Sequence, residues 1–200
     1  KGAKISSVAT VYENTNFGTG VNNAIKKNAA KYGYRLVADV AYAEKGTSAI
    51  AEVQKVKAAS PDVVMPASYT ADAILYMKTF KDLNYVPQAI LAMDAGYISD
   101  EFKKTLGKDG EYVLSREVWA LDLAKKKPMI AKVNEIYKKR FGRDMNGNSA
   151  RSFTGFLVLA DAINRAGSTD PEKIRESLEK YKLPGDKMIM PWQGVAFDPK

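Results

Sequence analysis

The 200-residue sequence contains neither cysteine nor histidine. Without cysteine there are no disulfides, no thiolate metal sites and no cysteine nucleophiles. Without histidine the Ser-His-Asp and Cys-His arrangements are excluded as well. A metal ion would find only carboxylates, and no motif supports catalysis by paired carboxylates or lysine. The sequence therefore predicts no catalytic residues, no metal site and no cofactor.

Long hydrophobic runs are also missing. A membrane-spanning helix needs roughly 20 apolar residues, and no run approaches that length. The start of the sequence has no positively charged region followed by an apolar stretch and a cleavage site, so we expect that any export signal has been removed or never existed. With 46% hydrophobic residues, the chain can bury one sizeable core or two modest ones.

The charge is not balanced, since the net charge is +8. The excess lies in lysine-rich stretches such as 125–127 and 138–140. Neither a recognition helix nor a basic stripe with interleaved aromatics is present, so we expect no nucleic-acid partner. Solvated lysines on outward helix faces explain most of the charge, and attraction to an anionic surface or ligand is the alternative.

The first part of the chain alternates between strand and helix patterns. A β-rich run at 5–11 leads into the loop ENTNFGTG, and apolar residues then recur at helical spacing up to Gly33, a typical C-terminal helix residue. Further strands are expected at 34–42, 63–65, 89–93 and 111–115, with helices at 47–59, 71–83 and 100–106 between them. This alternation predicts a doubly wound α/β fold with a parallel sheet.

After Arg116 the pattern becomes almost wholly helical. Helices are expected at 129–140, 149–166 and 171–181, the last beginning at an Asp170-Pro171 pair. Their apolar faces need a sheet that this part of the chain does not supply, unless they pack as a small bundle. Residues 192–198 alternate again, as an edge strand does. We therefore place a domain boundary near Glu117.

The sequence resembles the type I periplasmic substrate-binding proteins of branched-chain amino acid ABC transporters. The resemblance covers nearly the whole chain, through VYENTNFGTG, DVVMPASYTADAILYMKTFKDLNY, AILAMDAGY, NSARSFTGFLVLADAINRAG and WQGVAFDPK in this order. Each motif is weak by itself, and the order and spacing carry the resemblance. It implies a doubly wound α/β fold with one nearly complete lobe plus the helices of an incomplete second lobe.

The resemblance also implies how the lobes are divided. Residues 1–116 together with 189–200 would form ligand-binding lobe two, and 117–188 the later, helical part of lobe one. Hinge strands would lie near 115–117 and 187–193. The opening βα units of lobe one are missing from this pattern, so we expect a fragment that binds ligand weakly or not at all by itself. A missing N-terminal fragment of the same protein is then an expected partner.

By this resemblance the protein is a solute-binding protein and not an enzyme. It would capture a small molecule, an amino acid in the first instance, by hinge closure and deliver it to a membrane permease. The expected location is periplasmic or extracellular, with anchoring as a lipoprotein as an option. The alternatives are an aromatic carboxylate or amide ligand, or a ligand-sensing regulatory module. A nucleotide-using enzyme would need a phosphate loop, which Gly18-Thr19-Gly20 does not provide.

Three residues at the ends of expected strands are the main candidates for ligand contact. By the resemblance, Phe17 and Tyr69 are aromatics that close over the ligand, and Asp94 accepts the α-ammonium group of an amino acid. The alternatives are a hydrophobic staple for Phe17, an ordinary exposed turn residue for Tyr69 and a helix cap for Asp94. The family more often has Glu at the acidic position, so Asp94 shifts the ammonium site or leaves room for a larger ligand.

Three further residues are weaker candidates. Asn14 and Tyr97 are expected at the mouth of the site. Arg151, together with Phe153, lies before a helix assigned to lobe one and would reach the ligand from the other side, unless Arg151 is an ordinary surface residue. The carboxylate-binding groups that the family supplies from lobe one lie in its missing part.

Overall fold

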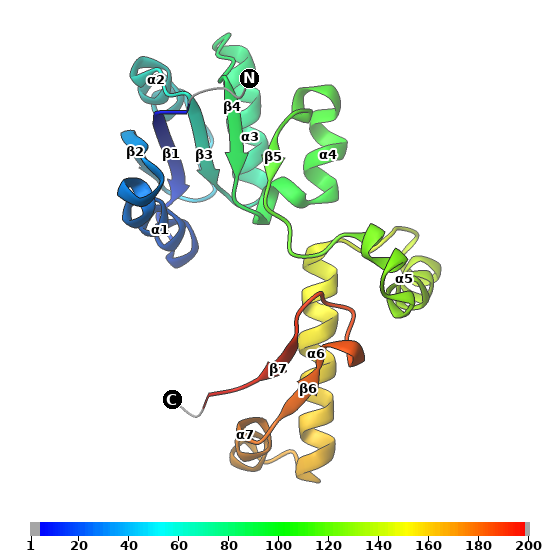
Figure 1. Ribbon diagram of the computed structural model, residues 1–200. Coiled ribbons are helices and arrows are strands. Elements are labelled where there is room, and N and C mark those ends of the chain that lie inside the picture. The colour runs from blue at the N-terminus through cyan, green and yellow to red at the C-terminus, as the bar shows by residue number, and fades with distance from the viewer. Residues whose placement is uncertain (1–4, 199–200) are drawn as a thin grey trace. The chain divides into compact units, whose positions relative to one another are not determined.

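The computed structural model describes residues 5–198 and divides into two units between Arg116 and Glu117 (Figure 1). The first unit contains a five-stranded parallel sheet in the order β2-β1-β3-β4-β5. Its strands are β1 (Ser7–Glu13), β2 (Arg35–Tyr42), β3 (Val63–Ala67), β4 (Ala89–Ala92) and β5 (Leu114–Ser115). Because β2 and β3 lie on opposite sides of β1, the strand order reverses between β1 and β3. The predicted doubly wound α/β fold is confirmed.

The helices of the first unit connect successive parallel strands. They are α1 (Asn16–Tyr32), α2 (Ile50–Ala59), α3 (Thr70–Asp82) and α4 (Asp100–Leu106), with the 3-10 turns η1 (Ala95–Ile98) and η2 (Gly107–Gly110) around α4. Helix α1 begins where the Thr15 hydroxyl accepts the Gly18 N–H, and it ends at Gly33 in the left-handed conformation, as its sequence predicts. Local sequence signals therefore fix both ends of the helix that follows β1.

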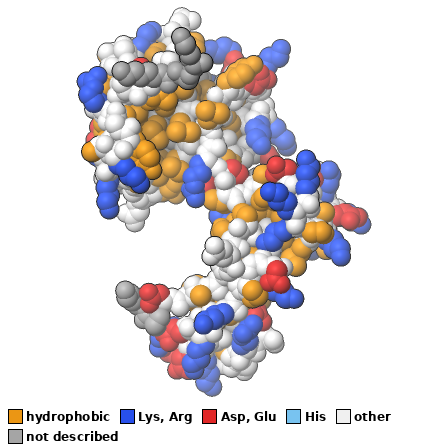
Figure 2. Space-filling model, viewed as in Figure 1, with side chains coloured by type: hydrophobic (Ala, Val, Ile, Leu, Met, Phe, Trp, Pro, Cys, Tyr) orange, Lys and Arg blue, Asp and Glu red, His pale blue; other side chains and the backbone are white. Residues whose placement is uncertain are grey.

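The two faces of the sheet are covered unequally. Helices α2, α3 and α4 pack on one face, around a cluster that includes Val11, Val53 and Val64. Helix α1 covers the other face near β1 and β3 through Ile25. On that face Leu91 and Leu114 are neighbours across β4 and β5 and remain 42% and 61% exposed. Figure 2 shows hydrophobic side chains gathered on the visible face of this unit.

The second unit is mainly helical. It contains η3 (Leu121–Lys125), α5 (Pro128–Phe141), α6 (Gly147–Ala166), α7 (Pro171–Glu179), η4 (Gly185–Lys187) and an antiparallel hairpin of β6 (Lys182–Pro184) with β7 (Gly194–Ala196). The expected edge strand at 192–198 is therefore the short strand β7. Among the described residues of this unit, the hairpin is the only sheet. It is too small to cover the apolar faces of the helices, so Phe156 on α6 and Ile136 on α5 stay 70% and 69% exposed.

The last segment packs within the second unit. The Trp119 indole N–H donates to the Ile189 carbonyl over 3.0 Å, and Met188, Ile189 and Met190 are buried with Trp119 in one cluster. The sequence led us to group 189–200 with the first unit, but the contacts of its described residues lie with the second. Pro199 and Lys200 lie outside the described residues. Within 5–198, no helix is long and apolar enough to cross a membrane.

Candidate functional site

The carboxyl ends of β1, β3 and β4 carry the main candidate residues. In an open α/β sheet, ligands bind at this edge, where the strand order reverses and where helix N-termini leave backbone N–H groups unpaired. Two backbone hydrogen bonds hold the β3 and β4 ends together, from Met93 N–H to the Pro66 carbonyl (2.9 Å) and from Gly96 N–H to the Ser68 carbonyl (3.0 Å). The segments after these strands therefore lie side by side in the first unit.

Phe17 and Tyr69 form an aromatic pair at this edge. Their ring centroids lie 5.4 Å apart at an interplanar angle of 28°, which is a stacked arrangement. Phe17 is the second residue of α1, and Tyr69 immediately precedes α3 with 48% of its surface exposed. Gly96 is close to this pair, because a Cβ atom at Gly96 would lie 2.5 Å from the Tyr69 carbonyl carbon. The structure thus brings Phe17, Tyr69 and the segment after β4 together.

Asp94 is buried at the end of β4, with 6% of its surface exposed. Its Oδ1 accepts the Ala95 N–H over 2.8 Å and so caps η1, and its Oδ2 lies 3.7 Å from the Arg116 guanidinium. The backbone of Asp94 has φ of 45°, a conformation that non-glycine residues rarely adopt and that is found disproportionately at functional sites. The capping alternative is therefore supported by a hydrogen bond, and the role as ammonium acceptor stays a prediction.

The three weaker candidates have different surroundings. Asn14 is exposed directly after β1, and its backbone N–H extends the ladder to Tyr42. Tyr97, expected at the mouth of the site, is instead 5% exposed and packs on Phe102 in the core. Arg151 lies in the second unit, on α6, where its guanidinium donates to the Asn148 side chain over 2.6 Å. Of these three, Asn14 alone lies exposed at the strand ends of the first unit.

A cluster of buried polar side chains near the carboxyl ends of the strands was not predicted. Its members come from β1, β2, the loop after β3, α3 and η1, and all are less than 9% exposed. They are Glu13, Tyr42, Ser68, Asp72 and Tyr97. A charged residue at the end of an otherwise apolar strand, just before a glycine-containing loop, is the sequence signal that would have identified Glu13.

Contacts inside the buried polar cluster are uneven. The Tyr97 hydroxyl donates to Ser68 Oγ over 3.4 Å, and both Asp72 oxygens accept the Lys45 backbone N–H over 3.1 and 3.2 Å. By contrast, the two carboxylate oxygens of Glu13 and the hydroxyl of Tyr42 have no hydrogen-bond partner of normal geometry within the described chain. Burial raises the pKa of the Tyr42 and Tyr97 hydroxyls, so both stay protonated at neutral pH.

Burial also raises the pKa of Glu13 to about 7. The nearby backbone N–H of Tyr69 opposes this shift, while the charges of Asp72 and Glu44 add to it. Glu13 is therefore poised between its neutral and ionised forms near neutral pH, close to the Tyr69 backbone N–H.

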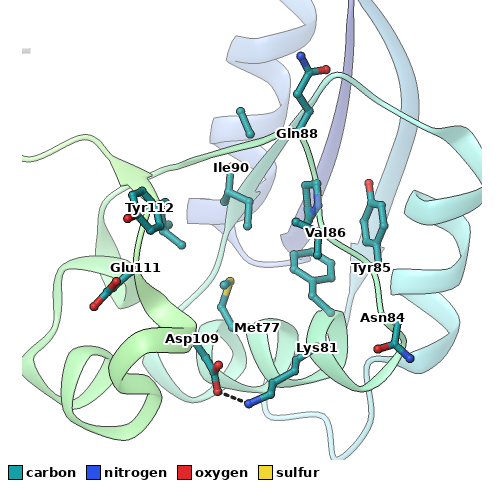
Figure 3. Close-up of a pocket in the computed structure, with 14 residues that line it drawn as sticks. Met77, Lys81, Asn84, Tyr85, Val86, Gln88, Ile90, Asp109, Glu111 and Tyr112 are labelled. Carbon is teal, nitrogen blue, oxygen red and sulfur yellow. Dashed lines mark hydrogen bonds and ion pairs between the residues drawn. The ribbon is translucent and has the colours of Figure 1, made fainter.

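A hollow of the first unit lies at the other edge of the sheet. Its volume is about 420 Å³, and its lining comes mainly from residues 84–90, which lead into β4, and from residues 109–113, which lead into β5 (Figure 3). Met77 and Ile90 form apolar walls, and Lys81 pairs with Asp109 over 2.7 Å at the rim. The hollow lies at the amino ends of the strands, away from the aromatic pair, so we do not assign the ligand to it.

No metal centre is evident within residues 5–198, since these hold no cluster of three or more acidic side chains that could bind an ion.

Comparison with known proteins identifies the family of this chain. The sequence model of the periplasmic binding protein family matches residues 1–198. A Leu/Ile/Val-binding protein homolog 7 of Brucella suis is 25% identical over 99% of this chain and 50% of its own length. A homolog 8 of Brucella abortus is 24% identical over 98% of this chain and 49% of its own length. The chain spans about half the length of these relatives.

Solved structures share the fold. A leucine-binding protein of Thermotoga maritima superposes with a TM-score of 0.79 at 24% identity, over 92% of this chain and 52% of its own. A fatty acid ABC transporter substrate-binding protein of Thermomonospora curvata superposes with a TM-score of 0.76 at 14% identity, over 98% of this chain and 58% of its own. One fold thus accommodates proteins named for quite different ligands.

Proposed function

Because this chain belongs to the periplasmic binding protein family, we propose that it is part of a solute-binding protein whose ligand sits at the carboxyl ends of β1, β3 and β4. Members of this family bind substrates and are not enzymes. The observation that carries the proposal is the meeting of the Phe17–Tyr69 stack and the buried carboxylate of Asp94 at one edge of the sheet.

We propose an amino acid, branched-chain or similar, as the ligand. The relatives named for Leu, Ile and Val support this class. The Asp94 carboxylate would accept the α-ammonium group, since charge-assisted hydrogen bonds in a water-poor site are about twice as strong as neutral ones. Arg116, which is 57% exposed, would move away from Asp94 as the ammonium group arrives. The aromatic pair would cover the aliphatic side chain.

The proposed mechanism is closure of two lobes around the ligand. A ligand that contacts both lobes favours the closed state by those contacts, and the closed form would be recognised by the membrane permease of an ABC transporter. The corresponding location is the periplasm or the outer cell surface, and a lipoprotein anchor would hold the protein at the membrane. A partner fragment would supply the rest of lobe one. An aromatic carboxylate or amide ligand, or a sensing role, is the alternative.

The experiment is a titration of the isotopically labelled 200-residue chain, followed by NMR, with L-leucine and with benzoate as probes. L-leucine is expected to shift the amide signals of Phe17, Tyr69 and residues 94–96 in a saturable way. Because one lobe supplies only part of the contacts, the binding should be weaker than micromolar. The substitution Asp94→Asn should weaken L-leucine binding about tenfold, as expected for loss of a hydrogen bond to a charged group.

The matched control is Asp82→Asn, which removes an exposed carboxylate at the end of α3 and should leave L-leucine binding unchanged. Saturable shifts with benzoate alone would reject the role of Asp94 and favour the aromatic acid alternative. Saturable shifts confined to the lining of the 420 Å³ hollow would contradict the proposed site.

A further inference from the structure

The carboxyl group of Glu13 is buried without a hydrogen-bond partner of normal geometry in the described chain, and its surroundings do not explain why a charged residue type stands there. Glu13 is the last residue of β1, none of its surface is exposed, and neither oxygen accepts a hydrogen bond of normal geometry from the described residues. Buried polar groups in folded proteins are nearly always paired, and an unpaired ionised carboxylate is strongly disfavoured. A neutral, protonated Glu13 is the form that this space accepts.

The charged side chains that act on Glu13 disfavour its ionised form, because both are carboxylates. From β2 comes the Tyr42 hydroxyl, from α3 the Asp72 carboxylate, and from η1 the Tyr97 hydroxyl, while Glu44 acts on it from the loop after β2. Lys45, which follows Glu44 in the chain, has its ammonium 3.8 Å from the Glu44 carboxylate. Within the described chain, two carboxylates and no cation act on Glu13, and its burial is the main cause of its raised pKa, about 7.

One backbone donor connects Glu13 to the aromatic pair. The Tyr69 N–H is the group that acts to lower the pKa of Glu13, and Tyr69 carries the ring that stacks on Phe17. The other side of the stack is also tied to Glu13. Gly18, next to Phe17, packs so closely that a Cβ atom there would overlap the Glu13 carbonyl oxygen. Glu13 therefore packs against the residue that follows Phe17 and lies close enough to the Tyr69 N–H to respond to it.

We propose that Glu13 is a proton-controlled positioning residue for the Phe17–Tyr69 pair. When protonated, it leaves the loop after β3 in the arrangement seen here. When it loses its proton to solvent, the carboxylate is repelled by Asp72 and attracted to the Tyr69 N–H, so that the backbone before α3 shifts and the stack is altered. The consequence for ligand affinity rests on the proposed function, but the change at Tyr69 does not.

The first test needs no ligand. In the full 200-residue chain, the amide signal of Tyr69 should titrate between pH 5 and pH 9 with a midpoint near 7. The titration should disappear in Glu13→Gln, whose neutral amide imitates the protonated acid, and should persist in the exposed control Glu44→Gln. A flat Tyr69 signal in the unaltered chain, or an unchanged titration in Glu13→Gln, would overturn the proposal.

The second measurement keeps the test valid even if Glu13→Gln does not fold. Carbon-13 labelling of the glutamate carboxyls reads the midpoint of Glu13 directly, and a value near the ordinary 4.5 would overturn the proposal as well. Binding of L-leucine at pH 6 and pH 8 then tests the consequence. The affinity should fall several-fold at pH 8 in the unaltered chain and stay constant in Glu13→Gln.

The outcomes separate the two proposals. If Tyr69 titrates as expected but L-leucine shifts only signals away from the strand ends, the positioning role stands and the proposed ligand site fails. If L-leucine binds equally at both pH values, the link between Glu13 and the ligand site is rejected.

Discussion

Asp62, just before β3, receives four hydrogen bonds on one carboxylate oxygen. The backbone N–H groups and hydroxyls of Ser6 and Ser7 donate to its Oδ2 over 2.8 to 2.9 Å, and the Asp62 N–H donates back to the Ser7 hydroxyl. These bonds, the Ser6 N–H first, lower the pKa of Asp62 to about 2. The residue ties the start of β1 to the start of β3.

This pKa predicts a specific acid dependence. Because the pKa of Asp62 is lower in the folded chain than its ordinary value of 3.8, its contribution to stability is present above pH 3.8 and is lost as the pH falls toward 2. Asp62→Asn should therefore lower the melting temperature at pH 7 and by much less at pH 2. Asp82→Asn is the control. Equal losses at both pH values would mean that the carboxylate charge is not what Ser6 and Ser7 recognise.

At the scale of single residues, the sequence predicted the side chains at the strand ends better than the buried polar cluster around Glu13. Phe17, Tyr69 and Asp94 follow apolar runs, and parallel topology brings such ends together, so their proximity could be expected. The cluster around Glu13 unites residues from five elements, and its burial depends on packing that no local pattern encodes. Tyr97 shows the same limit, since its position in a loop suggested exposure and the core instead accommodates it.

Helix α1 contains two glycines in its first turns with opposite surroundings. A Cβ atom at Gly18 would overlap the Glu13 carbonyl oxygen, whereas one at Gly20 would have no atom within 4 Å. Gly18 thus allows α1 to start close against the end of β1. Gly20 has no such role, and as a glycine inside a helix it costs stability relative to alanine.

Gly18→Ala and Gly20→Ala form a matched pair for this element. Gly18→Ala should destabilise the chain by about 2 kcal/mol or more, because backbone must move to admit the methyl group. Gly20→Ala should stabilise it by up to about 1 kcal/mol through helix propensity. Denaturant unfolding measures both. A similar small effect from the two substitutions would contradict the close packing of α1 on Glu13.

The elements themselves were largely predictable, with errors at their ends. Helix α4 matches the expected 100–106, and the Asp170-Pro171 start of α7 is confirmed by two hydrogen bonds to the Asp170 side chain. By contrast, the strand expected at 111–115 is the two-residue β5, and α2 starts at Ile50, three residues later than expected. The ends of edge strands and of short helices depend on neighbouring elements, so local sequence defines them poorly.

Each unit of the molecule has its own hydrophobic core. Every described cluster of buried apolar residues falls wholly within one unit, for example Val53 in the first and Ile130 in the second, both with no exposed surface. A domain with its own core can unfold separately. The chain should therefore not behave as a single two-state system.

Core substitutions can test this separation. Val53→Ala and Ile130→Ala should each destabilise their own unit, with a cost of about 2 to 4 kcal/mol for the isoleucine and less for the smaller valine. In calorimetry, each should lower one of two melting transitions and leave the other in place. A single transition lowered by both substitutions would show that the units unfold together.

The placement of Trp119 has a practical consequence for optical work. Both tryptophans of the sequence, Trp119 and Trp192, belong to the second unit, and the indole of Trp119 is held by the Ile189 carbonyl. Tryptophan emission therefore originates entirely outside the unit that carries Phe17 and Tyr69. A chain with both tryptophans changed to phenylalanine and Phe17 changed to tryptophan would carry a single fluorophore, stacked on Tyr69, as an optical reporter of that edge of the sheet.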